Sequence, residues 1–199
     1  SESEIFVSGN RCEVGEAIYT HKKIEKDKKS INIYKYKYDR VFDYKSLKAD
    51  KAKRGLIGIP RVLNMYENYP FWHTFLTELG FSVVLSAKST KDIFEKGISS
   101  IASDTVCYPA KLVHGHIEDL IEKGIKTIFY PSVTHEFRED PDSDNHFNCP
   151  VVTSYPEVIK SNMDSLEEND IRFINFFITL NDKNKLKKRI YSALKYHYP

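Results

Sequence analysis

Short apolar runs alternate with segments of helical periodicity through most of this chain, and this alternation limits the possible folds more than any other feature. The runs are continuously apolar, as in Gly55–Pro60, Phe81–Ser86 and Lys126–Pro131. Continuous apolar strands that are separated by helices are typical of a parallel sheet covered on both faces. We therefore predict a Rossmann-like α/β domain with three layers and a mostly parallel sheet, formed by residues 54–199.

Three further strands are expected, a short one just before Cys107 and two others at 151–153 and 171–177. Helical spacing of apolar residues, together with a possible cap at Ser89, predicts helices at 70–79, 91–97, 108–123, 157–163 and 183–197. Ligands of parallel sheets bind beyond the carboxyl ends of the strands. Four predicted strand ends carry polar or reactive residues, so we expect the functional site at the rim formed by 60–61, 107, 131–135 and 153–156.

Residues 1–53 read as an N-terminal arm or linker. Between Lys22 and Lys53 the arm interleaves lysines with four tyrosines, at positions 34, 36, 38 and 44. Such a pattern can mark a surface on which nucleic-acid bases stack. The rest of the chain has no basic stripe to extend that surface, so we expect the tyrosines to pack on the main domain and no nucleic acid to bind.

The composition sets further limits. A chain of 199 residues suits one domain with an appendage, and a formal net charge of +2 indicates no particular class of partner. The three cysteines lie far apart and are odd in number, which suits a reducing cytoplasm better than a disulfide framework. We see no signal peptide and no apolar run near the roughly 18 residues of a membrane span, so we expect no membrane segment.

Cys107 is the first candidate functional residue. It precedes Tyr108 and Pro109 at the expected start of a helix, where unpaired backbone N–H groups and the helix dipole favour a thiolate. A buried, inert cysteine is the alternative interpretation. If Cys107 is a nucleophile, His135 at a neighbouring strand end is a better base than His114 or His116, which lie farther along the same helix.

A metal site is a second possibility, with Cys107 and Cys149 as ligands and Cys12 as a third. These cysteines lack C-x-x-C spacing, so zinc-ribbon and ferredoxin patterns do not apply. Three scattered thiolates can still hold an iron–sulfur cluster that leaves one iron open. Nucleotide-binding motifs with G-x-G-x-x-G or a Walker loop are absent from the sequence.

Several longer motifs support a family resemblance. They are Ser8–Glu13, Gly58–Glu67 followed by Pro70-Phe71-Trp72, Ser103–Lys111 followed by Gly115-His116, Pro131, Asn148-Cys149-Pro150, and Ser154-Tyr155-Pro156. Together they resemble the activase-related domain of large proteins that are similar to (R)-2-hydroxyacyl-CoA dehydratase activators. The resemblance covers nearly the whole chain.

The resemblance implies a fold akin to the dehydratase and benzoyl-CoA reductase subunits, which hold a 4Fe-4S cluster on three cysteines. By analogy Cys107, Cys149 and Cys12 are the expected metal ligands. Lys111, His116 and His135 are the expected cofactor-binding residues, and Lys111 or His116 could place a positive charge near the cluster. The chain departs from the family pattern because it lacks the ATP-binding domains and the second dehydratase-like domain.

Three functions remain open at this point. The first is an iron–sulfur electron-transfer module of anaerobic metabolism, whose partners are ATP-binding activase domains, in the same or a partner chain, and an acyl-CoA dehydratase-type protein. The second is a non-catalytic domain that docks the ATPase region onto its redox partner. The third is a cysteine-dependent hydrolase or transferase, so whether the chain is an enzyme is left open.

Overall fold

The computed structural model describes residues 17, 32–48 and 50–198. The chain divides into two compact units, Ser1–Lys37 and Tyr38–Pro199, and the architecture below is that of the second unit. Cys12 lies outside the described residues. The predicted boundary between residues 53 and 54 stays a prediction.

The centre of the second unit is a parallel sheet of four strands. It consists of β1 (Leu56–Ile59), β2 (Ser82–Leu85), β3 (Thr127–Phe129) and β5 (Arg172–Ile174), in the order β2-β1-β3-β5. All three neighbouring pairs are parallel. The continuous apolar runs at 55–60, 81–86 and 126–131 therefore form the buried strands that their composition predicts, and the expected α/β fold is confirmed.

Two strands of the sheet continue past it as a narrow parallel ribbon. β4 (Ser132–Val133) pairs with β6 (Phe177–Ile178) in the same register that joins β3 to β5. The Tyr130 amide donates to the Ile174 carbonyl and the Ser132 amide donates to the Phe176 carbonyl, both at 3.0 Å, so the hydrogen bonds between the two strands continue across Pro131, whose missing N–H lies outside this ladder. The ribbon carries the chain beyond the carboxyl ends of β1 and β2.

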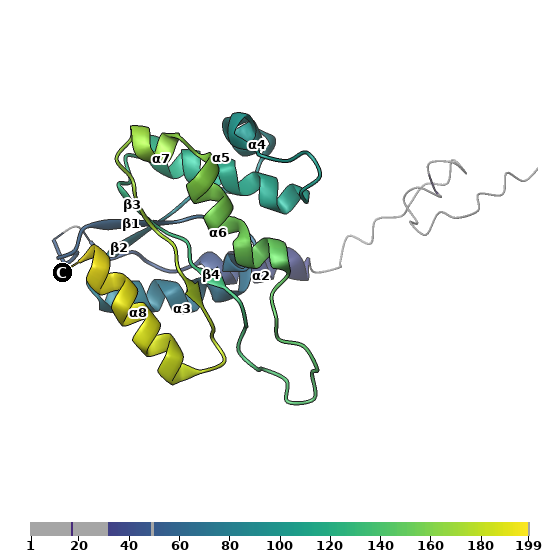
Figure 1. The fold of residues 1–199 in the computed structure, drawn as a ribbon, viewed down its shortest axis with the longest axis vertical. Coiled ribbons are helices and arrows are strands. Elements are labelled where there is room, and N and C mark those ends of the chain that lie inside the picture. The colour runs from purple at the N-terminus through teal and green to yellow at the C-terminus, as the bar shows by residue number, and fades with distance from the viewer. Residues whose placement is uncertain (1–16, 18–31, 49, 199) are drawn as a thin grey trace, which may run out of the picture. The chain divides into compact units, whose positions relative to one another are not determined.

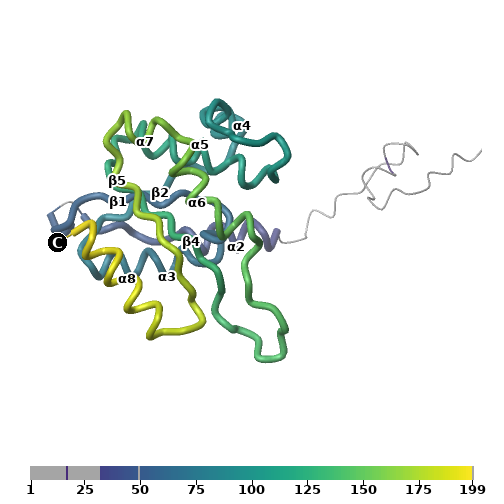
Figure 2. Tube along the Cα trace, in the orientation of Figure 1, coloured from purple at the N-terminus to yellow at the C-terminus, as the bar shows by residue number. Residues whose placement is uncertain are grey.

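Helices cover both faces of the sheet (Figure 1 and Figure 2). α3 (Met65–Glu78) and α8 (Lys183–His197) lie on one side. The other side carries α5 (Tyr108–Glu122) with its neighbours α4 (Lys91–Gly97), the short 3₁₀ helix η1 (Ile98–Ser100), α6 (Pro150–Asn162) and α7 (Ser165–Glu168). The three layers bury one continuous core, in which Trp72, Tyr69 and Phe129 are among the largest fully buried side chains.

Part of the expected arm packs into this core. The arm residues of α2 (Ile33–Phe42) that belong to the second unit include Tyr38 and Phe42, whose ring centroids are 5.1 Å apart. Phe42 is buried and also contacts the rings of Tyr66 and Tyr69. Tyr44 is 41% exposed but its ring contacts Tyr69, so the arm tyrosines 38 and 44 pack against the domain as expected, whereas those at positions 34 and 36 are more exposed.

Two predicted strands are wrong. Residues 151–153 lie in the first turn of α6, and residues 98–106, directly before Cys107, contain no strand but the helix η1 and the loop 101–106. Val151, Val152 and Thr153 are β-branched and favour a strand, but Pro150 at the first position and packing on β4 select a helix. Two of the four predicted strand ends are therefore helix starts.

Smaller differences concern helix boundaries. α3 begins at Met65, so Pro70 lies inside the helix rather than at its start. The side chain that caps α4 is Thr90, whose hydroxyl accepts from the Ile93 amide, and not Ser89. Ser89 is used elsewhere, in the hydrogen bonds of His116 described below. Among residues 32–48 and 50–198 no helix has the length and apolar character that a membrane crossing requires.

Candidate functional site

The two described cysteines occupy equivalent positions at the starts of two helices. Cys107 is the N-cap of α5 and Cys149 is the N-cap of α6, both with extended backbone ψ angles of 146° and 137°. A proline follows in the first turn of each helix, Pro109 in α5 and Pro150 in α6. Both thiols are free and exposed. The alternative of a buried, inert Cys107 is therefore wrong.

The two helices are joined by a buried hydrogen bond. His114 Nε2 of α5 lies 3.1 Å from the Tyr155 hydroxyl of α6, and the two rings meet almost at right angles, with centroids 5.7 Å apart. Each of these residues follows its N-cap cysteine by about two helical turns. Both helices also begin on the same side of the molecule in Figure 1. The two thiols thus lie at the same end of one helix pair.

Tyr155 also reports the proximity of Cys107. Burial raises the pKa of Tyr155 to about 12, and the negative charge of the Cys107 thiolate adds to this effect. Burial likewise raises the pKa of Tyr130, with a further contribution from Tyr155. Tyr155 therefore lies within the electrostatic range of both Cys107 and Tyr130.

His114 is fixed by its neighbours. Its Nδ1 lies 2.8 Å from the Ser100 hydroxyl of η1, while Nε2 contacts Tyr155. Burial lowers the pKa of His114 to about 4, so the ring is neutral near pH 7. A neutral ring with both nitrogens occupied holds three structural elements together, and the structure gives it no contact with the Cys107 thiol.

His116 is held in a similar way behind the carboxyl end of β2. Its two nitrogens lie 2.8 Å from the Ser86 hydroxyl and 2.9 Å from the Ser89 hydroxyl. Burial lowers the pKa of His116 to about 4, against the opposing effect of Asp119. The ring is therefore buried and neutral, and it does not supply the positive charge that the sequence suggested for it. Its cofactor-binding role stays a prediction that this geometry does not favour.

Lys111 and His135 lie in different surroundings. Lys111 is in the first turn of α5, near Cys107, and its ammonium donates to the Asp104 carbonyl at 2.7 Å. His135 follows β4, where its Nδ1 lies 3.0 Å from the Thr134 hydroxyl and its ring lies on Phe147, with centroids 3.9 Å apart. Within the described part of the chain, no hydrogen bond or ion pair joins either residue to a cysteine.

The sequence analysis missed how Asn148 fixes the start of α6. The Asn148 side-chain amide donates to the Val133 carbonyl at 3.1 Å and to Glu136 Oε1 at 2.5 Å, and its backbone amide donates to Thr134 at 3.0 Å. Asn68 of α3 donates to both oxygens of the same Glu136 carboxylate. Asn148 therefore ties the residue before Cys149 to the ribbon, which explains the polar residue of the Asn-Cys-Pro motif.

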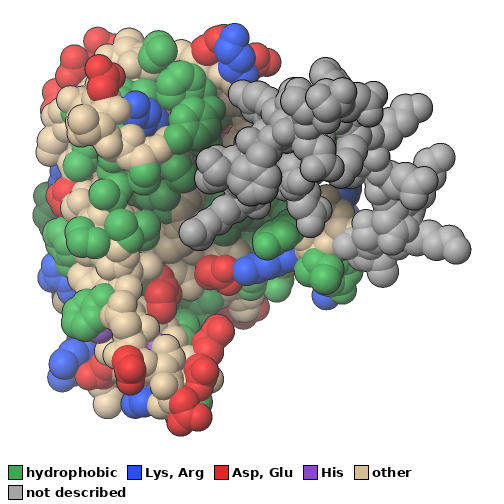
Figure 3. Space-filling view, turned by 90° about the vertical axis from the view of Figure 1, so that its right-hand side faces the viewer, with side chains coloured by type: hydrophobic (Ala, Val, Ile, Leu, Met, Phe, Trp, Pro, Cys, Tyr) green, Lys and Arg blue, Asp and Glu red, His purple; other side chains and the backbone are tan. Residues whose placement is uncertain are grey.

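An acidic loop lies next to this helix start. It connects β4 to α6 and contains five acidic residues between positions 136 and 144. Its acidic side chains gather at the lower end of the face shown in Figure 3. Cys149 thus follows a negatively charged segment, whereas Cys107 follows the uncharged hydroxyl residues Ser103 and Thr105 and the single acid Asp104.

Gly115 explains another motif residue. A Cβ atom on Gly115 would lie 1.6 Å from the Ile93 carbonyl oxygen, and one on Gly97 would lie 2.2 Å from the Gly115 amide nitrogen. The backbones of α4 and α5 therefore touch at these two glycines. The close approach lets η1, which follows α4, bring Ser100 to His114.

The two described thiols are of the kind that binds iron–sulfur clusters. Thiolates are the usual ligands of such clusters, and helix N-termini offer backbone donors that stabilise negative sulfur. Within the described residues, however, no three His, Cys, Asp or Glu side chains form a group that could hold a metal ion. The described part supplies two thiols, and the third cysteine of the chain lies outside it.

The fold and the cysteines define the chain as an α/β domain with two thiols at paired helix starts. Residues 56–198 match the family model of the CoA enzyme activase uncharacterised domain (DUF2229). The chain belongs to this family, and the resemblance to an activase-related domain is confirmed. No curated protein and no solved structure matches the chain.

Proposed function

We propose that this chain is the iron–sulfur-associated module of an acyl-CoA dehydratase activase-like protein and takes part in electron transfer. The observation that carries the proposal is the placement of two free, exposed cysteines as N-caps of adjacent helices in a CoA enzyme activase domain. A 4Fe-4S cluster, when bound, would supply a low-potential one-electron redox centre.

The chain's own residues would hold the thiolates and set their spacing. Neither thiol accepts a capping hydrogen bond in the structure, so the positive ends of the α5 and α6 dipoles would be what lowers the cost of a negative sulfur at Cys107 and Cys149. The His114–Tyr155 hydrogen bond would keep α5 and α6 in a fixed relation, and Asn148 would hold the segment before Cys149. Lys111 would add a positive charge near Cys107.

Cys12 is the proposed third ligand because it is the one other cysteine of the chain. In this proposal the ATP-binding activase domains, in the same or a partner chain, drive electrons through the module toward a dehydratase-type acyl-CoA enzyme. The neutral rings of His114 and His116 would exclude charge from the interior behind the cysteines.

Anaerobic reconstitution with ferrous iron and sulfide tests the proposal. We expect the 199-residue chain to bind iron with the broad visible absorption of a cluster, and iron per chain to fall to background in Cys107→Ser and Cys149→Ser. Ser154→Ala, an exposed change in the first turns of α6, should leave iron content unchanged. Equal iron content in the cysteine variants and the control would refute the ligand assignment.

A docking function is the second candidate, and it is favoured by the lack of a three-ligand group in the described residues. In that case the chain would join the ATPase region to its redox partner without binding metal. Charge reversal at the exposed residues Lys45 and Lys48 would then weaken complex formation, measured by co-sedimentation with the activase domains. If charge reversal at Lys45 and Lys48 left complex formation unchanged, and the cysteine variants lost iron, a purely docking function would be refuted.

A further inference from the structure

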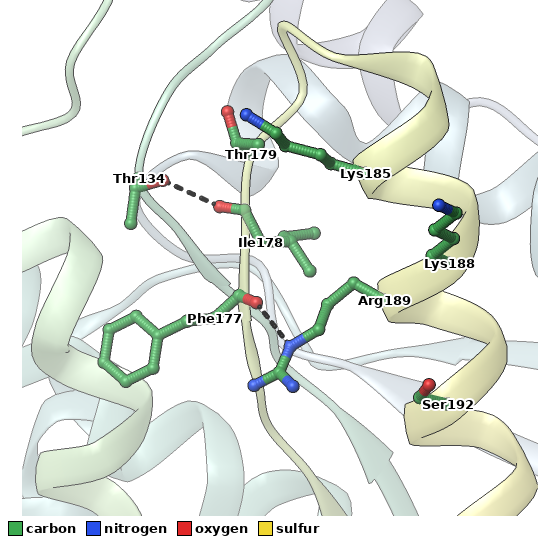
Figure 4. A pocket seen from close by; sticks show the side chains of 8 residues that line it. All are labelled: Thr134, Phe177, Ile178, Thr179, Lys185, Lys188, Arg189 and Ser192. Carbon is green, nitrogen blue, oxygen red and sulfur yellow. Dashed lines mark hydrogen bonds between the residues drawn. The ribbon is translucent and has the colours of Figure 1, made fainter.

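A second site lies between α8 and the ribbon, and neither Cys107 nor Cys149 lines it. A cavity of about 450 Å³ is lined on one side by residues of β6 and the segments that follow β4 and β6, and on the other by α8 (Figure 4). Cavities of a few hundred Å³ are the size that small-molecule ligands occupy. The cavity is lined by Thr134, Phe177, Ile178, Thr179, Lys185, Lys188, Arg189 and Ser192.

One face of α8 forms the helical wall. Lys185, Lys188, Arg189 and Ser192 are spaced at i, i+3, i+4 and i+7, the spacing of neighbours along one side of a helix. The adjoining Leu186 and Ile190 are the buried residues of α8 and anchor it to the core. The polar wall therefore has a fixed position relative to the strands.

The wall is strongly basic. α8 contains six lysine and arginine residues and no acidic residue between Lys183 and His197. Lys185 lies 3.6 Å from the carboxylate of the N-cap residue Asp182. Arg189 donates from Nε to the Phe177 carbonyl at 3.1 Å, which fixes its guanidinium at the cavity (Figure 4). Among the described residues, the Arg189 Nη groups and the Lys188 ammonium have no hydrogen-bond or ion-pair partner.

The opposite wall combines apolar and hydroxyl groups. Ile178 of β6 points toward α8, whereas the ring of the neighbouring Phe177, a residue that is 45% exposed, extends to the other side of β6 (Figure 4). Thr134 and Thr179 directly follow β4 and β6, so the cavity lies at the carboxyl end of the ribbon. Ligands of parallel strands bind at such ends, and the first turns of α8 add the positive end of a helix dipole.

We propose that this cavity binds a small phosphate ester with an apolar or aromatic part. Arg189 offers paired N–H donors that match the oxygens of a phosphate, and Lys188 adds a second cation. The apolar part of the ligand would lie against β6, where Ile178 and Phe177 line the cavity. Neither Cys107 nor Cys149 lines this site, and it goes beyond the proposed function because it requires no metal.

Isothermal titration of the 199-residue chain with octyl phosphate, inorganic phosphate and octanol tests the site. We expect saturable binding of octyl phosphate, weaker binding of inorganic phosphate and none of octanol. Removing one charged donor should weaken octyl phosphate binding about tenfold, the usual cost of a lost charge-assisted hydrogen bond. This loss is expected for Lys188→Gln and for Arg189→Gln, and partial rescue is expected for Arg189→Lys.

Lys187→Gln is the matched control, because it removes the same charge from the exposed surface of α8 without touching the cavity. Binding in this variant should stay within about twofold of the unchanged chain, since an exposed charge contributes little. Near-ultraviolet circular dichroism checks that each variant is folded. No binding, or an equal loss in Lys187→Gln and Lys188→Gln, would overturn the site. The site would also be overturned if an oligonucleotide bound more tightly than octyl phosphate and if all three glutamine variants lost that binding equally. Such a result would indicate a general basic surface on α8.

Discussion

Acid should destabilise this fold well above the pH at which carboxylates titrate, because burial lowers the pKa of His73, His114 and His116, with the largest effects at His114 and His116. Burial lowers the pKa of His114 and of His116 from 6.5 to about 4. The unfolded chain therefore binds more protons than the folded chain between pH 6.5 and 4. The stabilisation is complete above pH 6.5 and is lost as the pH falls toward 4.

The size of the effect follows from the two pKa values. Lowering the pH from 7 to 5 should reduce the free energy of unfolding by about 2 kcal/mol for each histidine, so by about 4 kcal/mol for the pair. A loss of this size is a large part of the stability of a typical domain, which is about 5–15 kcal/mol. Burial opposes ionisation of Asp119, but hydrogen bonds from Lys123 and from the Ala87 amide lower the pKa of Asp119 overall. Asp119 therefore loses its contribution to the free energy of unfolding at a lower pH than the histidines do.

Urea unfolding at pH 5, 6 and 7 measures this loss. Trp72 is the single tryptophan of the chain and is fully buried, so its fluorescence follows unfolding of the core. In His116→Asn and His114→Gln, which keep a polar group but cannot be protonated, each slope of unfolding free energy against pH should fall by about half. Slopes equal to that of the unchanged chain would refute the assignment of the acid sensitivity to these two rings.

Three further predictions concern packing and the cysteines. In urea unfolding, Gly115→Ala should destabilise the chain by about 1–3 kcal/mol or more, because the new Cβ would collide with the Ile93 carbonyl. Gly124→Ala should cost only about 1 kcal/mol, because a Cβ there has open space and only the backbone φ of +75° is unfavourable. Phe42→Ala should cost about 3–5 kcal/mol in the same assay, and a loss below 1 kcal/mol would contradict its place in the aromatic core. Cys107 and Cys149 should both be alkylated by iodoacetamide in the folded chain, as mass spectrometry would show, and protection of either until urea is added would contradict its exposure.

The sheet and most helices could be predicted from the sequence because their signals are local. Continuous apolar strands and helical spacing of apolar residues identify β1, β2, β3 and α8 within a few residues. The strand predicted at 151–153 failed because local β-propensity was overridden by the start of α6 and by its packing on β4. Tertiary contacts of this kind are not visible in a short sequence window.

The site was predictable in its residues but not in its arrangement. Cys107 and Cys149 stand out as thiols before prolines, but the sequence did not show that each would be the N-cap of a helix. The Tyr155 partner of His114 and the Val133 contact of Asn148 join residues far apart in the chain. No periodicity or spacing in the sequence indicates such pairs, so the structural roles of these polar residues emerge only from the fold.

The central claim is that the thiols of Cys107 and Cys149 lie close enough to share one cluster. Two ligands of a single cluster lie within about 7 Å of each other, given metal–thiolate bonds of about 2.3 Å. Reaction of the folded Cys12→Ser chain with dibromobimane, which becomes fluorescent when both of its arms have alkylated thiols, measures this directly. We predict a fluorescent, singly bridged chain that disappears in the further variant Cys149→Ser. Two separately labelled thiols without the bridge would contradict the claim.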